Sequence, residues 1–311
     1  MLFFRHASLG TALLSLMFTP VLAAQTAESA APAWDVSGKV RAGLEYQSNV
    51  NVSELNQASG QSDSARLLEA DLNASWQATD KLQFFAGYSL QDKKYQEAND
   101  FNLRLHLAFL DSQYQWGATS FGINLYHADA QLAAAPFLTL TQSSIYAMHS
   151  ASDTWYLRPA LTLGQKRFDS ISGRDAQTRS LSADSFWFSA DGQRFISLGL
   201  RYDWEDAEAA EFRYQAPAVQ LKMSTRFTAW TLPQQLQFGA RLAQRQYEMH
   251  KVQNTTGDRN DLQRQLDLQW QVGLSDRFAI ISKVEHGDFQ SILDSADYTE
   301  TRGSMSIQLS F

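Results

Sequence analysis

The chain has 311 residues, no cysteine and a formal net charge of −7, so neither a disulfide scaffold nor a basic nucleic-acid-binding protein is expected. Hydrophobic residues make up 44% of the chain but are spread evenly, and no segment beyond the N-terminus is apolar for the roughly 20 residues that a membrane-spanning helix needs. The composition therefore excludes a helical membrane protein, and an aromatic content of 12% is unusual for a soluble exported enzyme.

The N-terminus has the pattern of a secretory signal peptide. Arg5 precedes an apolar stretch at 9–18, and the small residues Ala23 and Ala24 offer a cleavage site. The apolar stretch is too short to remain as a spanning helix. The expected organisation is a cleaved signal peptide (1–24), a short polar periplasmic leader (25–33) and a single folded domain (34–311).

The rest of the chain alternates with a period of two, which indicates β-strands with unlike faces. Apolar residues occupy every second position in the segments 36–46, 68–76, 101–109, 157–163, 196–204, 266–272 and 301–311. The intervening residues are mostly polar, so that Arg41 and Glu45 face away from Val40 and Leu44. A soluble sheet can show this pattern, but in a transmembrane barrel the apolar face meets lipid and the polar face meets a wet lumen.

The connections favour the barrel, because short and long ones alternate like periplasmic turns and extracellular loops. Short connections are expected at 79–81, 117–120, 150–153, 190–193, 231–234 and 275–276, and long ones at 47–64, 92–100, 127–136, 169–179, 205–211, 248–260 and 287–297. We predict an all-β, antiparallel up-and-down barrel of about 14 strands in the outer membrane of a Gram-negative bacterium. The alternative is about 12 strands, since residues 110–116 and 181–188 interrupt the alternation.

The final strand and the tryptophans support a membrane location. Ile307, Leu309 and the terminal Phe311 share one apolar face, as in the C-terminal strand by which outer-membrane barrels are recognised for assembly. We expect these three residues to bind the barrel-assembly machinery. Tryptophans lie near predicted strand ends, where aromatic girdles occur, at Trp76, Trp116, Trp155, Trp187, Trp204, Trp230 and Trp270.

The polar strand faces are the functional surface that the sequence offers. The residues expected to line the lumen as a pore are Arg41, Glu69, Asp71, Arg104, Arg158, Lys166, Arg201, Asp203, Arg226, Arg241, Lys283 and Arg302. Basic residues prevail among them, so the lumen should be mildly basic and favour anions. Alternatively, these charges pair across strands and stiffen the interior.

The sequence lacks the patterns of catalytic and metal sites. The histidines beyond the signal peptide are His106, His127, His149, His250 and His286, and no pair has HExxH spacing. No GxSxG motif occurs, and cysteine ligands are absent. We therefore predict that the protein is not an enzyme and that it holds no cofactor and no metal.

The segment GLEYQSNVNVSEL (43–55) resembles the start of the barrel in surface lipoprotein assembly modifiers and related tetratricopeptide-linked outer-membrane barrels, in which a Tyr-x-Ser-Asn-Val-like segment follows the first strand. Segments 174–188, 197–214 and 298–311 are similar to the same barrel class. The resemblance implies a barrel that helps to deliver lipoproteins or other exported material to the cell surface. Its partners would then include an exported client or a periplasmic protein.

Two hypotheses about function follow. The first is an outer-membrane channel or export conduit with a polar, mildly basic lumen, surrounded by outer-membrane lipid. The alternative is a structural or surface-interaction barrel that binds a partner through its long extracellular loops at 47–64 and 248–260.

Overall fold

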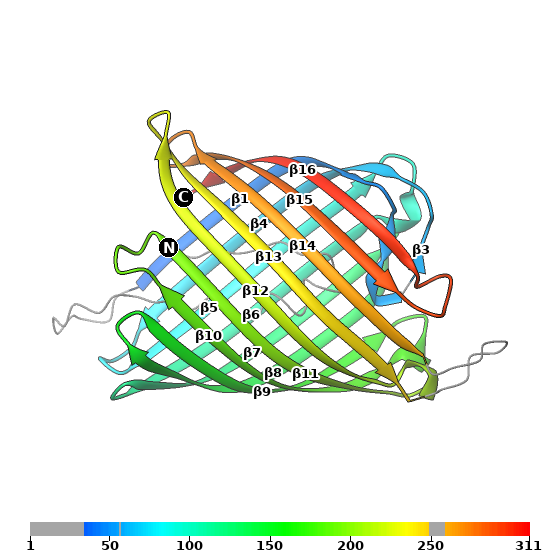
Figure 1. Ribbon diagram of the computed structural model, residues 1–311, viewed down its shortest axis with the longest axis horizontal. Coiled ribbons are helices and arrows are strands. Elements are labelled where there is room, and N and C mark those ends of the chain that lie inside the picture. Colours follow the sequence, from blue (N-terminus) through cyan, green and yellow to red (C-terminus); the bar gives the residue numbers. More distant parts are fainter. Residues whose placement is uncertain (1–33, 56, 249–258) are drawn as a thin grey trace.

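The computed structural model describes residues 34–55, 57–248 and 259–311. The strands form one closed antiparallel up-and-down barrel of 14 strands (Figure 1). This confirms the predicted fold class and strand number, and the alternative of about 12 strands is wrong. The predicted signal peptide (1–24) and leader (25–33) lie outside the described residues.

Each barrel strand pairs with its neighbours in the chain, and β1 closes the ring on β16. The barrel strands are β1 (Trp34–Gln47), β4 (Asp63–Gln77), β5 (Leu82–Tyr95), β6 (Leu103–Trp116), β7 (Thr119–Leu132), β8 (Ala135–Ser152), β9 (Trp155–Phe168), β10 (Ala176–Phe188), β11 (Arg194–Ala207), β12 (Tyr214–Ala229), β13 (Leu232–Tyr247), β14 (Asn260–Gly273), β15 (Phe278–Gln290) and β16 (Tyr298–Ser310). The connections contain β2 (Asn51–Val52), β3 (Gln57–Ala58) and the 3-10 helices η1 (Ser53–Leu55), η2 (Asn99–Phe101), η3 (Ser172–Arg174) and η4 (Ala210–Phe212).

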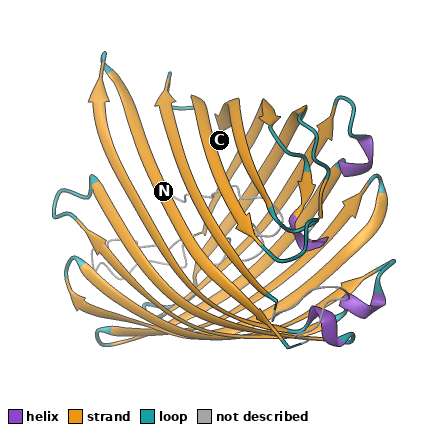
Figure 2. Cartoon of the chain, turned by 45° about the vertical axis from the view of Figure 1, so that its right-hand side comes forward, coloured by secondary structure: helices purple, strands orange, loops and turns teal. Residues whose placement is uncertain are grey.

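The two rims of the barrel differ in the length of their connections. One rim has the short turns 78–81, 117–118, 153–154, 189–193, 230–231 and 274–277, and the other has the connections 48–62, 96–102, 133–134, 169–175, 208–213, 248–259 and 291–297. Figure 2 shows the 3-10 helices gathered at this second rim. Longer loops face the cell exterior in this class of barrel. We therefore call the second rim the outer rim and the first the inner rim.

One predicted long connection, at 127–136, is wrong. β7 continues to Leu132 and β8 begins at Ala135, so only Ala133 and Ala134 join them. Their φ angles are 50° and 64°, in the left-handed region that alanine adopts rarely. Because both turn residues are alanine, the sequence gives no Gly or Asn signal for this hairpin, and the alternation of short and long connections fails here.

Along most of the barrel strands, alternate residues face outward and inward. Leu44 and Leu161 are exposed on the outside, whereas Asp71 and Arg158 are buried on the inside. This assignment confirms the alternation predicted for most strands.

Tryptophans collect at the inner rim. Trp34 and Trp76 stand opposite each other on β1 and β4 and stack with ring centroids 5.1 Å apart and planes 3° apart. Trp116, Trp155 and Trp230 are exposed at the same rim. Amphipathic rings in this position suit the interface between membrane and water.

Strand β6 is turned the opposite way from the prediction. Leu105 and Leu107 are 1% and 3% exposed inside the barrel, while Arg104 is exposed on the outer wall. Arg104 is therefore not a lumen residue, and that prediction is wrong. The physical reason is that Leu105 and Leu107 pack inside the barrel in an apolar cluster with residues of β7, β8 and β9 and with Val52, from the connection between β1 and β4.

Candidate functional site

The connection between β1 and β4 (residues 48–62), here called the first loop, folds into the barrel. Val50 is completely buried, and Val52 and Glu54 are 6% and 9% exposed. β2 and β3 pair within the loop, and the Val50 N–H donates to the Gln61 carbonyl at 2.8 Å. The loop is thus a compact element of the barrel interior, although the sequence predicts an extracellular loop and a contact surface at 47–64.

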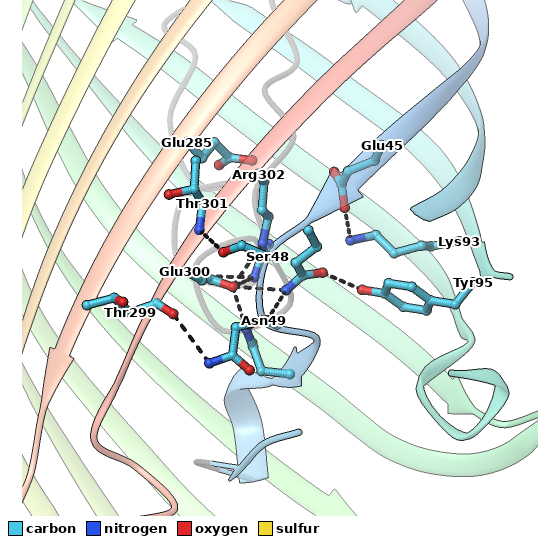
Figure 3. Close-up of polar contacts among 12 residues, drawn as sticks. Glu45, Ser48, Asn49, Lys93, Tyr95, Glu285, Thr299, Glu300, Thr301 and Arg302 are labelled. Carbon is cyan, nitrogen blue, oxygen red and sulfur yellow. Dashed lines mark hydrogen bonds and ion pairs between the residues drawn. The ribbon is translucent and has the colours of Figure 1, made fainter. Parts of the chain in front are cut away.

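The near end of the first loop is fixed to β16 (Figure 3). The Ser48 N–H donates to the Thr301 carbonyl at 2.9 Å, and the Thr301 N–H donates to Ser48 Oγ at 2.8 Å. Asn49 Nδ2 donates to the Thr299 carbonyl at 3.3 Å. The loop therefore continues the β1–β16 closure of the barrel.

Glu300 is the centre of this anchor. Its carboxylate pairs with the Arg302 guanidinium at 2.8 Å and accepts hydrogen bonds from Gln47 Nε2 at 2.9 Å and from Asn51 Nδ2. The Tyr95 hydroxyl donates to Gln47 Oε1 at 2.5 Å. The buried carboxylate receives donors from the wall and from the loop, so it couples the position of one to the other.

The far end of the first loop reaches the opposite wall. Glu54 Oε2 lies 3.3 Å from Lys166 Nζ on β9, which is far from β1 in the order of strands around the barrel. Lys166 Nζ is also 2.8 Å from Glu205 Oε2 on β11. Val52 joins a buried apolar cluster whose other members are Leu105, Leu107, Ala128, Ala130, Phe137, Leu138, Leu140 and Phe168. The first loop therefore crosses the outer mouth.

A second outer loop clamps the first. Arg174 of η3 donates through Nη1 to the Glu54 carbonyl and through Nη2 to the Leu55 carbonyl, both at 2.9 Å. The Arg174 guanidinium lies 4.0 Å from the ring centroid of Phe212, and burial lowers the pKa of this guanidinium from its ordinary value. These hydrogen bonds hold the same end of the first loop that the Glu54–Lys166 ion pair holds.

A cavity of about 100 Å³ lies beside the first loop. Its lining combines apolar side chains, among them Val52, Phe101 and Ile281, with charged ones. The charged part contains the ion pairs Arg41–Glu69 (3.0 Å), Lys93–Glu45 (2.5 Å) and Lys283–Glu285 (2.8 Å), together with Arg302, the partner of Glu300. The cations of this part of the lumen are thus matched by carboxylates. The field of these pairs in the lumen is that of closely spaced dipoles rather than of isolated positive charges.

Most residues predicted to line the lumen lie on the inner face. These are Arg41, Glu69, Asp71, Arg158, Lys166, Arg201, Asp203, Arg226, Arg241, Lys283 and Arg302. Lys166 and Arg302 are brought to the two ends of the first loop, while Arg104 lies outside. That the inner residues form a pore stays a prediction.

Sequence reasoning missed Gln47, Glu54 and Arg174 as parts of one site. A signal was present, because the predicted loop carries apolar Val50 and Val52 at alternating positions, which is unusual for a solvated loop. The partners of these residues are distant in sequence and could not be identified from it.

The residues of the predicted assembly signal share the outer face. Ile307 and Phe311 are 59% and 67% exposed, and Leu309 has the same outward orientation. The Phe311 N–H donates to the Gly38 carbonyl at 3.0 Å, and the Gly38 N–H donates back at 2.8 Å. Recognition of these residues by the assembly machinery stays a prediction.

In the described ranges 34–55, 57–248 and 259–311, no group of three or more His, Asp or Glu side chains is arranged to hold a metal ion. Within the same ranges, no helix is both long and apolar enough to cross a membrane.

Solved outer-membrane proteins share this architecture. The chain is similar to an anion-selective porin from Comamonas acidovorans, with a TM-score of 0.50 and 10% identity over 90% of this chain and 100% of the porin. It is also similar to OmpT, an outer membrane protein of Vibrio cholerae, with a TM-score of 0.51 and 9% identity over 91% of this chain and 100% of OmpT. At such identities the likeness concerns the fold alone.

No curated protein matches the chain. The family model for the surface lipoprotein assembly modifier matches residues 35–277, which is most of the barrel. The chain, an outer-membrane barrel by its fold, belongs to the surface lipoprotein assembly modifier family.

Proposed function

We propose that the protein is an outer-membrane export conduit whose outer mouth is closed by the first loop and opens when that loop leaves the opposite wall. The observation that carries the proposal is the crossing of the mouth by residues 48–62, held at one end by Glu300 and at the other by Lys166. In a loop that lay only on the surface, Val52 and Glu54 would be exposed to solvent, whereas here both are buried inside the barrel.

The contacts at the far end suit a reversible closure. When Glu54 leaves, Lys166 keeps its second carboxylate, Glu205, at 2.8 Å. Opening therefore does not leave Lys166 buried without a carboxylate partner, which would cost several kcal/mol. What is lost is one charge pair, two hydrogen bonds from Arg174 and the burial of Val52, each worth about 1–3 kcal/mol. A client that binds the loop could supply that free energy.

Membership of the surface lipoprotein assembly modifier family suggests the exported material. We propose that lipoproteins, or other exported chains, use the polar lumen with the help of a periplasmic partner. Paired charges along the wall would let a polypeptide pass without binding tightly, since conduction needs weak and multiple contacts.

The test locks the first loop. The chain has no cysteine, so Glu54→Cys with Arg174→Cys introduces the only two thiols, which a short bifunctional maleimide can join. Before cross-linking, the refolded barrel should open to large conductance steps in a planar bilayer, because the Glu54–Lys166 ion pair and the hydrogen bonds of Arg174 side-chain nitrogens are gone. After cross-linking it should be silent. The same double variant treated with a monofunctional maleimide is the control and should stay open.

Export is tested in cells with the same variants. Acyl-labelled lipoproteins should reach protease-accessible positions on the surface less often after cross-linking than before it. Equal conductance in the linked and unlinked states would contradict closure by the loop. Changed conductance with unchanged surface exposure of lipoproteins would contradict the export role and leave a channel.

A further inference from the structure

Outside the barrel, three basic side chains gather on the wall just below the outer rim. Arg66 on β4, Lys94 on β5 and Arg104 on β6 point outward and are exposed; we call them the outer basic cluster. Their three strands are neighbours in the barrel (Figure 1). Arg66 stands directly opposite Lys94 in the strand register, and Arg104 stands directly opposite Asp92. The three cations therefore belong to one surface patch.

A single carboxylate lies within the outer basic cluster. Asp92 Oδ1 accepts a hydrogen bond from Arg104 Nε at 3.0 Å, and Asp92 Oδ2 lies 3.6 Å from Lys94 Nζ. The Asp92 side chain is 16% exposed, whereas those of Lys94 and Arg104 are 58% and 44% exposed. Asp92 thus offsets one of the three positive charges, while the outer surfaces of Lys94 and Arg104 stay accessible. Three cations and one carboxylate leave the patch with a net charge of +2.

Apolar side chains adjoin the cluster on the membrane side. Leu44 is paired with Arg66 and is 65% exposed, and Leu68 is paired with Asp92 and is 46% exposed. Leu72, further toward the inner rim on β4, is 51% exposed. Cations at the rim with an apolar wall beneath them match a ligand that is anionic at its head and hydrocarbon below.

We propose that the outer basic cluster binds the phosphate groups of lipopolysaccharide, the phosphorylated and multiply acylated glycolipid of the outer leaflet, with acyl chains lying along Leu68 and Leu72. Guanidinium groups bind phosphate oxygens through paired, charge-assisted hydrogen bonds, and an ammonium adds a third positive charge. The outer rim places these cations at the depth of the outer-leaflet head groups. At the edge of a bilayer, charge attraction is stronger than in bulk water.

The net positive charge distinguishes the outer basic cluster from another basic residue of the outer wall. Arg264 on β14 is matched by Asp288 on β15 at 2.9 Å, so that pair carries no net charge. The pair is similarly placed toward the outer rim and serves as a matched control. The proposal depends on neither channel activity nor lipoprotein export.

The test uses the full chain refolded in zwitterionic detergent, titrated with purified lipopolysaccharide and followed by native mass spectrometry. The triple variant Arg66→Gln, Lys94→Gln and Arg104→Gln should bind about tenfold or more weakly, because several charge-assisted hydrogen bonds are lost. The control variant Arg264→Gln should bind within about twofold of the unmodified protein. Equal binding by the triple variant would overturn the proposal.

The choice of lipid separates phosphate recognition from general attraction to anions. Dephosphorylated lipopolysaccharide should bind the unmodified protein as weakly as the complete lipid binds the triple variant. Phosphatidylglycerol should displace the glycolipid only at large excess; displacement at equal concentration would overturn the proposal. If the triple variant does not refold, Asp92→Asn provides the second test. It removes the neutralising carboxylate and should tighten binding, so an unchanged or weaker affinity would count against the site.

Discussion

Glu54, in the first loop, forms an ion pair with Lys166 on the opposite wall of the barrel, with 3.3 Å between Oε2 and Nζ. The pair joins a segment that leaves β1 to a strand far from it around the barrel. It therefore holds the far end of the first loop against the opposite wall, and its removal is the most direct test of the proposed closure.

The first prediction concerns Glu54→Gln. The amide keeps the size of the side chain but loses its charge, so the closed state should be destabilised by about 1–2 kcal/mol and the open probability should rise by about tenfold. Single-channel recording of the refolded barrel measures this directly. Asp288→Asn, which removes a carboxylate from the outer wall, should leave the open probability unchanged. Equal open probabilities for Glu54→Gln and the unmodified protein would show that the pair does not hold the mouth closed.

The second prediction concerns the apolar anchor. Val52→Ala removes buried methyl groups from the cluster with Leu105 and Leu140 and should weaken docking of the loop by about 1–2 kcal/mol. Amide hydrogen exchange in residues 48–62 should accelerate accordingly, while exchange in the barrel strands stays slow. Val36→Ala, at a 63% exposed position on the outer wall, is the matched control. Equal acceleration in both variants would mean that burial of Val52 contributes nothing specific.

The third prediction uses the corrected position of Arg104. Arg241 faces the lumen and contacts Gln265 at 3.4 Å, whereas Arg104 faces outward. Arg241→Glu should shift the reversal potential in a salt gradient toward cation preference, because a positive lumen charge becomes negative. Arg104→Glu makes the same charge change outside the permeation path and should leave the reversal potential as it is. A larger shift of the reversal potential for Arg104→Glu than for Arg241→Glu would contradict the assignment of Arg104 to the outer face and Arg241 to the lumen.

The fourth prediction concerns the seam between β1 and β16. A Cβ atom added at Gly43 would lie 2.5 Å from the Met305 carbonyl oxygen and 2.8 Å from the Ser306 Cα, both backbone atoms that cannot move aside. Gly43→Ala should therefore destabilise the seam by about 1–3 kcal/mol. Gly303, across the same seam, has nothing within 4 Å of its added Cβ, and Gly303→Ala should be tolerated. The two variants are heated in sodium dodecyl sulfate to a series of temperatures and separated by electrophoresis in the cold, and the temperature at which the folded band disappears is compared. Equal temperatures for Gly43→Ala and Gly303→Ala would contradict the close contact predicted at Gly43.

Much of the fold could be predicted from the sequence, because the lipid outside and the water inside impose opposite preferences on alternate residues. The rule fails at β6, where Leu105 and Leu107 point inward. The apolar inner face is buried in a cluster with residues of β7, β8 and β9 and with Val52. A strand pattern carries no information about a partner as distant as Val52.

The candidate site was predicted only in part for a related reason. Lys166 and Arg302 follow from strand alternation, but Glu54 lies in the connection that the sequence predicts to be an extracellular loop. Its role depends on the whole loop turning inward. The hairpin at Ala133 and Ala134 was missed because its left-handed turn is enforced by the paired strands rather than by residues that favour that conformation.

The anchoring of the first loop at both ends fixes an order of events during folding. The loop emerges early in synthesis, yet its near end needs Thr301 and Glu300 of the last strand, and its far end needs the paired β6 to β9. The first loop cannot dock until β1 and β16 have paired, so a newly closed barrel passes through a stage in which this loop is not yet docked inside it. Opening for transport would then retrace the final step of maturation, a local undocking that leaves the remaining strands paired and the membrane seal intact.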